Sequence, residues 1–443
     1  MTMLRKPVAC CAVCALLTAA VAASPQTTYP PRKSSSTNSA AQALNRLLAD
    51  AQAAIDRQDY PTAVQDYQDY LAKKPDDATV HYNLGYVYTA MEQPADARTE
   101  YEKAISLDPK MGAAYLNLAL TLLSDDPTGA IEPLQKAVEL MPGQARPPLL
   151  LGKALERSGK LSQAIDAFRA ADKIDGMDFE IHYSLATALL DASRPAEAEP
   201  EFRAAIELHH DDSEAAKAEL GLANTLIAQK KPEEAARELA LYCELEPDDA
   251  EVRVQRASLL IDLGKDAEAL AELDRAAATR LEDLRTLKMR SQIYYQAKRY
   301  DDAVAALQKA ESMAPQDVTI AARLGHVYLE KKDYADAARQ LAAAHGMDPK
   351  ADDILSELVV AQFMTQNYAA TLGSLDALSK RKDLPAESWF VRATCYDKLE
   401  QPAQALEAYQ KFLELNKDQN NDMYFASAAR VRALKRELEE KKR

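Results

Sequence analysis

Apolar and polar residues recur along this chain at the spacing of amphipathic helices, and the pattern itself repeats about every 34 residues from Leu44 to Gln419. Each copy predicts two helices joined by a short turn, often with a proline just after the second helix. In the clearest copy, Ala78–Met111, the recurring residues are Leu84, Gly85, Tyr88, Ala97, Tyr101, Ala104 and Pro109. A fixed period of this length predicts a stack of helical units in place of one globular core.

Two positions of each copy favour small residues, because crossing helices approach closely only where side chains are small. The first set is Gly85, Ala119, Gly152, Ala186, Ala223, Ala257 and Gly325. The second set is Ala63, Ala97, Ala130, Ala164, Ala198, Ala235, Ala269, Ala303, Ala337 and Ala405. A larger side chain there would overpack the crossing at a cost of about 1–3 kcal/mol. The tenth copy has Val359 and Thr371 instead, which predicts its packing to be the least regular.

Repeated eleven times in nearly constant register, this signature resembles the tetratricopeptide repeat, a helix-turn-helix unit. The copies begin at Leu44, Ala78, Gly112, Ala145, Phe179, Ala216, Ala250, Leu284, Val318, Asp352 and Ala386. The third copy is one residue short, and three extra residues, 213–215, precede the sixth. The resemblance implies an all-α, right-handed superhelical solenoid. It also implies that the first helix of each repeat lines a concave groove, which binds an extended segment or a helix of another protein.

The N-terminal residues 1–23 have the pattern of a secretory signal peptide. Arg5 and Lys6 precede an apolar run over residues 8–21, and Ala23 precedes a cleavage position before Ser24. The run is shorter than the roughly 20 residues that span a bilayer, although an uncleaved anchor stays open. We therefore expect export to the cell envelope, with the periplasm favoured over extracellular release.

The segments on either side of the repeats are expected to be a leader and a cap. Residues 24–43 are rich in Ser, Pro and Thr, which predicts a flexible leader. Residues 420–443 predict a helix that covers the apolar face of the last repeat, followed by a charged tail. The apolar residues of that helix are Tyr424, Phe425, Ala428, Val431, Leu434 and Leu438.

Net charge limits the class of partner, and the positions of the cysteines limit the disulfides that can form. A formal charge of −15 makes the chain a poor general binder of nucleic acid or anionic membrane. Three of the five cysteines lie in the signal sequence. Cys243 and Cys395 lie in distant repeats, and repeats contact only their neighbours, so we expect two free thiols and no disulfide between them.

The first candidate binding patch combines amides, tyrosines and cations at positions that face the groove in the tetratricopeptide family. It consists of Tyr82, Asn83, Tyr86, Asn117, Arg146, Lys153 and Arg157. Amides one period apart can hold the backbone of an extended peptide, and tyrosine offers an apolar face with a polar tip. The three cations lie on one helix face and would suit a peptide with an acidic end. The alternative is that these are consensus residues and a solvated face.

The second candidate patch is an anion site in the eighth and ninth repeats. Its residues are Lys288, Gln292, Arg323 and His326, next to Arg285. Co-chaperones of this family clamp a terminal carboxylate with Lys and Asn from successive repeats, and Lys288, Gln292 and Arg323 match part of that clamp. Asp353 and Glu357 stand where the clamp needs cations, so the clamp is incomplete, which argues against a chaperone-adaptor role.

Candidate chemistry is sparse. The run 209–212, with two histidines and two aspartates, holds potential metal ligands but falls at an inter-repeat turn, where polar residues are expected. Paired aspartates such as Asp76–Asp77 and Asp248–Asp249 suit helix capping. The chain has no phosphate-binding loop, HExxH, GxSxG or paired CxxC motif. We predict no cofactor, no metal and no enzymatic activity.

These observations favour a non-enzymatic scaffold or adaptor that binds a protein or peptide segment in the groove. The first alternative is a self-assembling envelope component, in which two copies pair through the C-terminal helix or a terminal repeat. A second alternative is a non-catalytic subunit of an envelope enzyme complex. The sequence does not identify the partner.

Overall fold

The computed structural model describes residues 37–209, 213–279, 282–418 and 422–440. These residues form helices and turns, with no strand among them. The predicted signal sequence and most of the predicted leader lie outside the described residues. The chain divides into two compact units, residues 1–231 and 232–443, and we describe each by itself. The boundary falls inside the sixth predicted repeat, where the sequence pattern gives no sign of a division.

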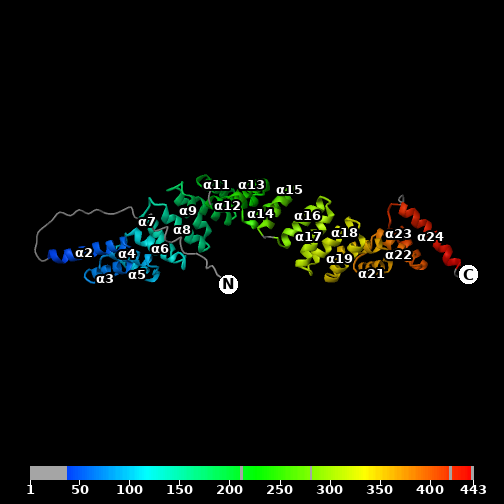
Figure 1. Ribbon diagram of the computed structural model, residues 1–443, viewed down its shortest axis with the longest axis horizontal. Helices are drawn as coiled ribbons and strands as arrows, with labels where there is room; N and C mark the ends of the chain where they lie inside the picture. Colours follow the sequence, from blue (N-terminus) through cyan, green and yellow to red (C-terminus); the bar gives the residue numbers. More distant parts are fainter. Residues whose placement is uncertain (1–36, 210–212, 280–281, 419–421, 441–443) are drawn as a thin grey trace. The chain divides into compact units, whose positions relative to one another are not determined.

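Unit 1 contains the helices of the first five repeats and the first helix of the sixth (Figure 1). They are α2 (Thr37–Asp56), α3 (Tyr60–Leu71), α4 (Ala78–Ala90), α5 (Pro94–Leu107), α6 (Gly112–Leu122), α7 (Ile131–Leu140), α8 (Arg146–Arg157), α9 (Leu161–Asp172), α10 (Phe179–Asp191), α11 (Pro195–Leu208) and α12 (Ser213–Ala228). Each helix packs on the next one in sequence, as the helix pairs of a repeat array do.

Unit 2 contains the remaining helices. They are α13 (Pro232–Leu245), α14 (Ala250–Asp262), α15 (Asp266–Ala278), α16 (Leu284–Gln296), α17 (Tyr300–Met313), α18 (Val318–Glu330), α19 (Tyr334–Met347), α20 (Asp352–Met364), α21 (Tyr368–Ser379), α22 (Ala386–Lys398), α23 (Pro402–Leu415) and α24 (Asp422–Glu440). Consecutive helices again pack on one another, so unit 2 is also an all-α stack of helix pairs.

The predicted repeat register is confirmed at most helix starts. The helices α4, α6, α10, α14, α16, α18, α20 and α22 all begin at the first residue of a predicted repeat. The inserted residues 213–215 extend α12 at its start. The predicted end of the leader at residue 43 is wrong, because α2 already begins at Thr37. Residues 40–43 are Ala, Ala, Gln and Ala, which favour helix, and they continue the helix of the first repeat.

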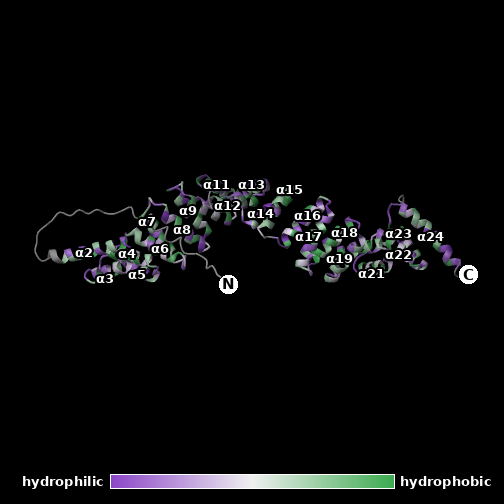
Figure 2. Ribbon diagram, in the orientation of Figure 1, coloured by the Kyte–Doolittle hydropathy of each residue, from purple (hydrophilic) through white to green (hydrophobic). Residues whose placement is uncertain are grey.

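The small residues lie where the helices of a pair cross, and large apolar residues fill the space beside them. Ala97, Ala164 and Ala198 are fully buried, and so are the rings of Tyr101 and Phe168. A Cβ atom on Gly85 would lie only 2.8 Å from the ring of Tyr101, so no larger residue fits without movement. Figure 2 shows apolar and polar residues interleaved along the helices of both units. The core is therefore distributed along each stack.

Aspartates fix the starts of several first helices. Asp77 caps α4 by accepting from the backbone of Val80, and Asp249 caps α14 by accepting from Glu251 and Val252. These bonds satisfy N–H groups that have no partner within the helix. The predicted capping role of the paired aspartates is confirmed at these two positions.

The tenth repeat forms a helix pair despite its unusual residues. Val359 and Thr371 are both buried, and α20 packs on α21. The Thr371 hydroxyl donates to the carbonyl of Asn367 at 2.9 Å, which satisfies its polar group inside the core.

The C-terminal helix covers the end of unit 2, but not with every residue predicted. Ser427, Val431 and Leu434 of α24 are buried, and the two apolar side chains join the core formed with α23. The prediction that Phe425 covers this face is wrong, because its side chain is 58% exposed. Phe425 lies off the helix stripe that runs through the three buried residues, so it points elsewhere.

A recurring polar bridge joins the two helices of a repeat to the turn before it. His81 contacts Glu100 at 2.6 Å and the carbonyl of Pro75 at 2.9 Å. His182 contacts Glu201 at 2.8 Å and the carbonyl of Gly176 at 3.0 Å. The histidine, the glutamate and the carbonyl occupy equivalent repeat positions in both cases.

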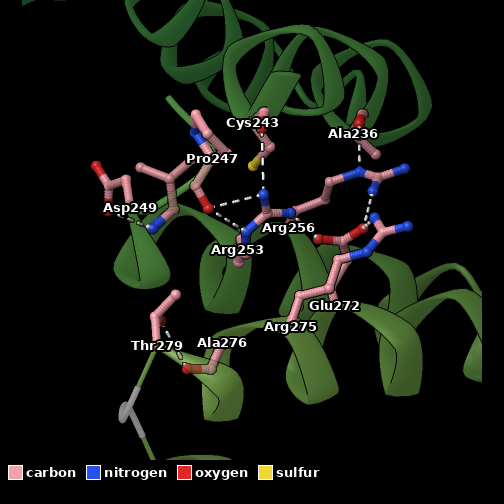
Figure 3. Close-up of polar contacts among 11 residues, drawn as sticks. Ala236, Cys243, Pro247, Asp249, Arg253, Arg256, Glu272, Arg275, Ala276 and Thr279 are labelled. Carbon is pink, nitrogen blue, oxygen red and sulfur yellow. Dashed lines mark hydrogen bonds and ion pairs between the residues drawn. The ribbon is translucent and has the colours of Figure 1, made fainter. Parts of the chain in front are cut away.

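Arg253 and Glu272 form the same bridge in unit 2 and enlarge it into a buried cluster (Figure 3). Arg253 donates to Glu272 at 3.0 Å and to the carbonyl of Pro247 at 2.9 Å. Arg256 and Arg275 bind the other carboxylate oxygen at 2.5 and 2.7 Å, while the Glu272 side chain is only 2% exposed. Because Glu272 holds three guanidinium groups, it ties α14 and α15 together electrostatically.

Candidate functional site

Two adjoining cavities lie along the first helices of the repeats in unit 1. The first has a volume of about 760 Å³ and is lined by residues of α8, α10 and α12 and by the turn before α10. The second has a volume of about 350 Å³ and continues from α10 past α8 to α6. Lys153 and Glu180 line both. In the tetratricopeptide geometry these helices face the groove, so the cavities mark the groove in unit 1.

The start of α10 supplies the aromatic wall of the larger cavity. Asp178 caps the helix by accepting from the backbone of Glu180 at 2.8 Å and of Ile181 at 3.3 Å. Phe179 and Tyr183 are one turn apart and stack with ring centroids 5.6 Å apart and planes 10° apart. The His209 ring meets Phe179 edge-on at 5.1 Å. The cap therefore fixes the start of the helix that carries a flat aromatic surface along the cavity.

The structure brings the three predicted cations of this region to the cavities. Arg146 lines the smaller cavity, Arg157 lines the larger one, and Lys153 lines both. Lys153 forms an ion pair with Glu180, and Arg157 donates to the carbonyl of Leu123 at 2.9 Å. These contacts cross from one repeat to the next, so the cations also hold neighbouring first helices together.

The remaining residues of the first patch do not line either cavity. They are Tyr82, Asn83, Tyr86 and Asn117, on α4 and α6. Asn117 donates to the hydroxyl of Tyr82 at 3.1 Å, and the Tyr82 ring lies 5.9 Å from that of Tyr101. Burial raises the pKa of Tyr67, and a hydrogen bond from Asn83 opposes this rise. Both amides therefore contact tyrosines of the preceding repeat. Their role as a peptide backbone ladder stays a prediction.

The charges around the larger cavity differ from those expected from the sequence. Five carboxylates and three Lys or Arg side chains line it. Glu156, on α8, is partly buried, and burial together with nearby Asp191 raises its pKa, although Lys153 and Arg157 oppose the rise. The expected preference for an acidic peptide end is therefore not supported here, because acids outnumber the cations that would bind it.

Sequence reasoning missed the aromatic wall and Met177, which is 76% exposed at the cavity. A signal for Tyr183 was present. The pair His182–Tyr183 occupies the same repeat positions as His81–Tyr82, three repeats earlier. The exposure of Met177 and the ring of His209 depend on the turns before α10 and α12, whose conformation the repeat pattern does not specify.

The second predicted patch lies on α16 and α18 of unit 2, and two of its three basic side chains, Lys288 and His326, contact carboxylates. Lys288 contacts Asp317 at 2.7 Å, and this contact lowers the pKa of Asp317 to about 2. His326 contacts Glu357 at 2.9 Å and the Tyr295 hydroxyl at 2.9 Å.

Two members of the second patch, Gln292 and Arg323, are exposed. Arg323 has no ion pair within the described residues. Neighbouring Arg285 contacts Glu251 at 2.6 Å. Anion binding at this patch stays a prediction that rests mainly on Arg323.

Other candidate chemistry adds no site. Cys243 and Cys395 are free and buried, and burial raises the pKa of Cys395 to about 11. The described residues contain no group of His, Cys, Asp or Glu placed to hold a metal ion, and residues 210–212 of the candidate metal run lie outside them. Over the same part of the chain, no helix is long and apolar enough to cross a membrane.

Stacked helix pairs with cavities along their first helices define a helical repeat protein, and comparisons with known families agree. Models described as tetratricopeptide repeat match residues 78–111 and 386–419, residues 183–250, 254–318 and 322–375, and residues 294–344. A model described as TPR repeat matches residues 51–92. Together they span more than half of the chain, which belongs to the tetratricopeptide repeat family. Such repeats are protein-interaction modules, so the chain is best described as a protein-interaction scaffold.

Several solved structures resemble parts of the chain. MamA 41-end from Desulfovibrio magneticus RS-1 is 21% identical, covers 38% of this chain and 94% of its own, and has a TM-score of 0.36. Pseudomonas aeruginosa PilF is 21% identical, covers 47% and 93%, and has a TM-score of 0.37. Yeast Tom70 is 14% identical, covers 90% and 96%, and has a TM-score of 0.31. A comparison with curated proteins gives no match.

Proposed function

We propose that this protein is a non-enzymatic adaptor that holds an extended segment of a partner protein along α8, α10 and α12 of unit 1. The observation that carries the proposal is the 760 Å³ cavity on these three helices. Its lining combines aromatic rings with charged side chains, which is the composition of a peptide-recognition surface. The smaller cavity beside it lengthens the available surface along the same helices.

Binding in such a groove needs recognition but no bond-making. Lys153 and Arg157 already contact the neighbouring repeat, so they are held in place before a ligand arrives. A preorganised side chain loses less conformational freedom on binding, which favours affinity. Several modest contacts along one segment then add together because the segment is continuous.

The test is partner capture with matched baits. The first bait is the wild-type chain, and the second carries Lys153→Ala with Tyr183→Ala in the groove of unit 1. A control bait carries Lys288→Ala with Arg323→Ala in unit 2, which removes two cations far along the sequence. We expect a partner protein that the wild-type and control baits retain and the groove variant loses. Equal retention by all three baits, or loss by the control bait alone, would contradict the proposal.

The second part of the proposal is that the protein is exported to the cell envelope and acts in the periplasm. Its support is the sequence of residues 1–23, which lie outside the described residues. The test is the N-terminal sequence of the protein recovered from envelope and cytosolic fractions. We expect an envelope protein that begins at Ser24. A cytosolic protein that begins at Met1 would contradict export.

Self-assembly is a second candidate function, favoured by the apolar side chains exposed on α24. Met423 is 41% exposed and Phe425 is 58% exposed on this terminal helix. A second copy of the chain could cover them. Sedimentation at increasing concentration would show a growing mass that Phe425→Glu abolishes, whereas a constant monomer mass would exclude this candidate.

A further inference from the structure

The larger cavity of unit 1 carries more negative charge than its own residues neutralise. Five carboxylates face three cationic side chains, and Lys153 is already paired with Glu180. Arg157 is held to the carbonyl of Leu123. The net charge of the lining is therefore negative, which disfavours an acidic ligand and favours a cationic one.

Four of the five carboxylates have local partners. Asp178 caps α10, and Asp175 accepts from the backbone of Met177 at 3.2 Å. Glu180 pairs with Lys153, and Glu214 lies 3.6 Å from His209. These contacts fix the side chains in structural roles and leave them less available to a ligand.

Glu156 is the exception. No hydrogen bond or ion pair joins its carboxylate to another described residue, although the side chain is partly buried at the cavity. Burial and the charge of Asp191 raise its pKa, and the nearby charges of Lys153 and Arg157 oppose this rise without cancelling it. A ligand cation at this point would provide a counter-charge.

The wall of the cavity suits the shape of such a cation. Phe179 and Tyr183 are stacked with their planes 10° apart, and the thioether of Met177 is exposed beside them. A guanidinium group is planar, stacks on aromatic faces and binds carboxylates through two parallel hydrogen bonds. Its aliphatic stem also packs well against apolar surface.

We propose that this cavity binds an arginine side chain of the partner segment, with Glu156 as the counter-ion and the Phe179–Tyr183 pair as the stacking surface. The inference rests on the proposed function, since it specifies which segment the groove accepts. Arginine is preferred to lysine because only the planar group uses both the carboxylate and the rings.

The experiment is selection from a display library of random linear peptides on the full chain. We expect enriched peptides to share an arginine at one position. Replacing that arginine by citrulline, which keeps the shape and removes the charge, should weaken binding about tenfold. Glu156→Gln should weaken the parent peptide by a similar factor and leave the citrulline peptide nearly unchanged. Glu102→Gln, an exposed acid on α5 outside the cavity, is the matched control and should leave both affinities unchanged.

The outcomes separate this inference from the proposed function. One outcome would overturn the arginine site and leave the adaptor function intact. The selected peptides would depend on Tyr183, but they would show no arginine preference and would bind Glu156→Gln as well as the wild-type chain. Selection that yields no peptide dependent on Tyr183 would overturn both. If Glu156→Gln disturbs α8, selection on Glu156→Arg decides the matter, because the inference expects acidic peptides there and an unchanged preference would contradict it.

Discussion

The first helices of the repeats carry paired lysines in both units, but in unit 1 an unpaired carboxylate lies beside them at a cavity. In unit 1, Lys153 pairs with Glu180 of the next repeat, and the same cavity is lined by Glu156, whose carboxylate has no hydrogen bond or ion pair to another described residue. In unit 2, Lys288 contacts Asp317 and His326 contacts Glu357, so neighbouring first helices are bridged. The lysines at these positions therefore already have counter-charges from the next repeat in both units, and the charge that unit 1 leaves to a ligand is the carboxylate of Glu156.

The units also differ in how the recurring polar bridge is built. Unit 1 uses histidine, at His81 and His182, whereas unit 2 uses Arg253 within the Glu272 cluster. Histidine changes charge near neutral pH, but arginine stays charged at all accessible pH values. At His182, burial opposes the charged form but hydrogen bonds to Glu201 and the Gly176 carbonyl raise the pKa, so this contact depends on pH, whereas the contact of Arg253 does not.

The largest expected effect is the loss of Glu272. Glu272→Ala would leave Arg253 and Arg256 without their counter-charge in a nearly buried site, which should cost about 3–5 kcal/mol. We expect hydrogen exchange to show lost protection in α14 and α15 while α8 and α10 keep theirs. Glu268→Ala, an exposed acid on the same helix, is the control and should change little. Equal loss of protection in both units would contradict this picture of local coupling.

A crossing-point substitution should damage unit 1 in the same local way. Gly85→Val would place its Cβ about 2.8 Å from the Tyr101 ring, and such overpacking typically costs about 1–3 kcal/mol. Protection should fall in α4 and α5 and persist in unit 2. Gly346→Val on α19 is the matched control, because a Cβ there meets no atom within 4 Å. A uniform loss along the chain would argue against neighbour-limited coupling.

His182 should make α10 more stable at lower pH. Burial opposes its charged form, but hydrogen bonds to Glu201 and the Gly176 carbonyl, with the charge of Asp172, raise its pKa above 6.5. A raised folded pKa stabilises the charged, folded form. The contribution is therefore fully present below pH 6.5 and is lost as the pH rises through the folded value.

Hydrogen exchange of α10 across this range, corrected for intrinsic exchange rates, measures the effect. His182→Gln should abolish the pH dependence, and the Arg253 region of unit 2 should not show it. A pH dependence of α10 that survives His182→Gln would show that other groups cause it.

The smallest expected effect is the loss of Lys288. Its pair with Asp317 is partly exposed, so Lys288→Met should change the free energy of unfolding by about 0–1 kcal/mol. Peptides selected on the wild-type chain should bind this variant unchanged, because Lys288 lies in unit 2, outside the cavity that Glu156 and Tyr183 line. A clear loss of peptide affinity, measured by titration, would move the binding site toward unit 2.

The sequence predicts the helix pairs well because their requirements are local. Small residues such as Gly85 and Ala97 and capping aspartates such as Asp77 act within one repeat. The same residue types therefore recur at the same positions of successive repeats. The predictions for the start of α2 and for the burial of Phe425 were wrong because the terminal repeats have a neighbour on one side only. The end of a stack is therefore less constrained by the pattern.

The groove was predicted only in part. Arg146, Lys153 and Arg157 follow from the family's positions, and the structure places all three at the cavities. Which carboxylate pairs with which cation depends on side-chain rotamers across the contact between repeats, and a linear pattern does not contain that information. The lack of a partner for Glu156 could therefore be seen only in three dimensions.

The most direct test of the account is hydrogen exchange of the chain with and without a peptide selected on it. We expect added protection in α8, α10 and α12 of unit 1, greatest around Glu156 and Tyr183, with little change in unit 2. Protection centred on α16, α18 and α20 instead would contradict it, because the bound segment would then lie away from the cavity that Glu156 and Tyr183 line.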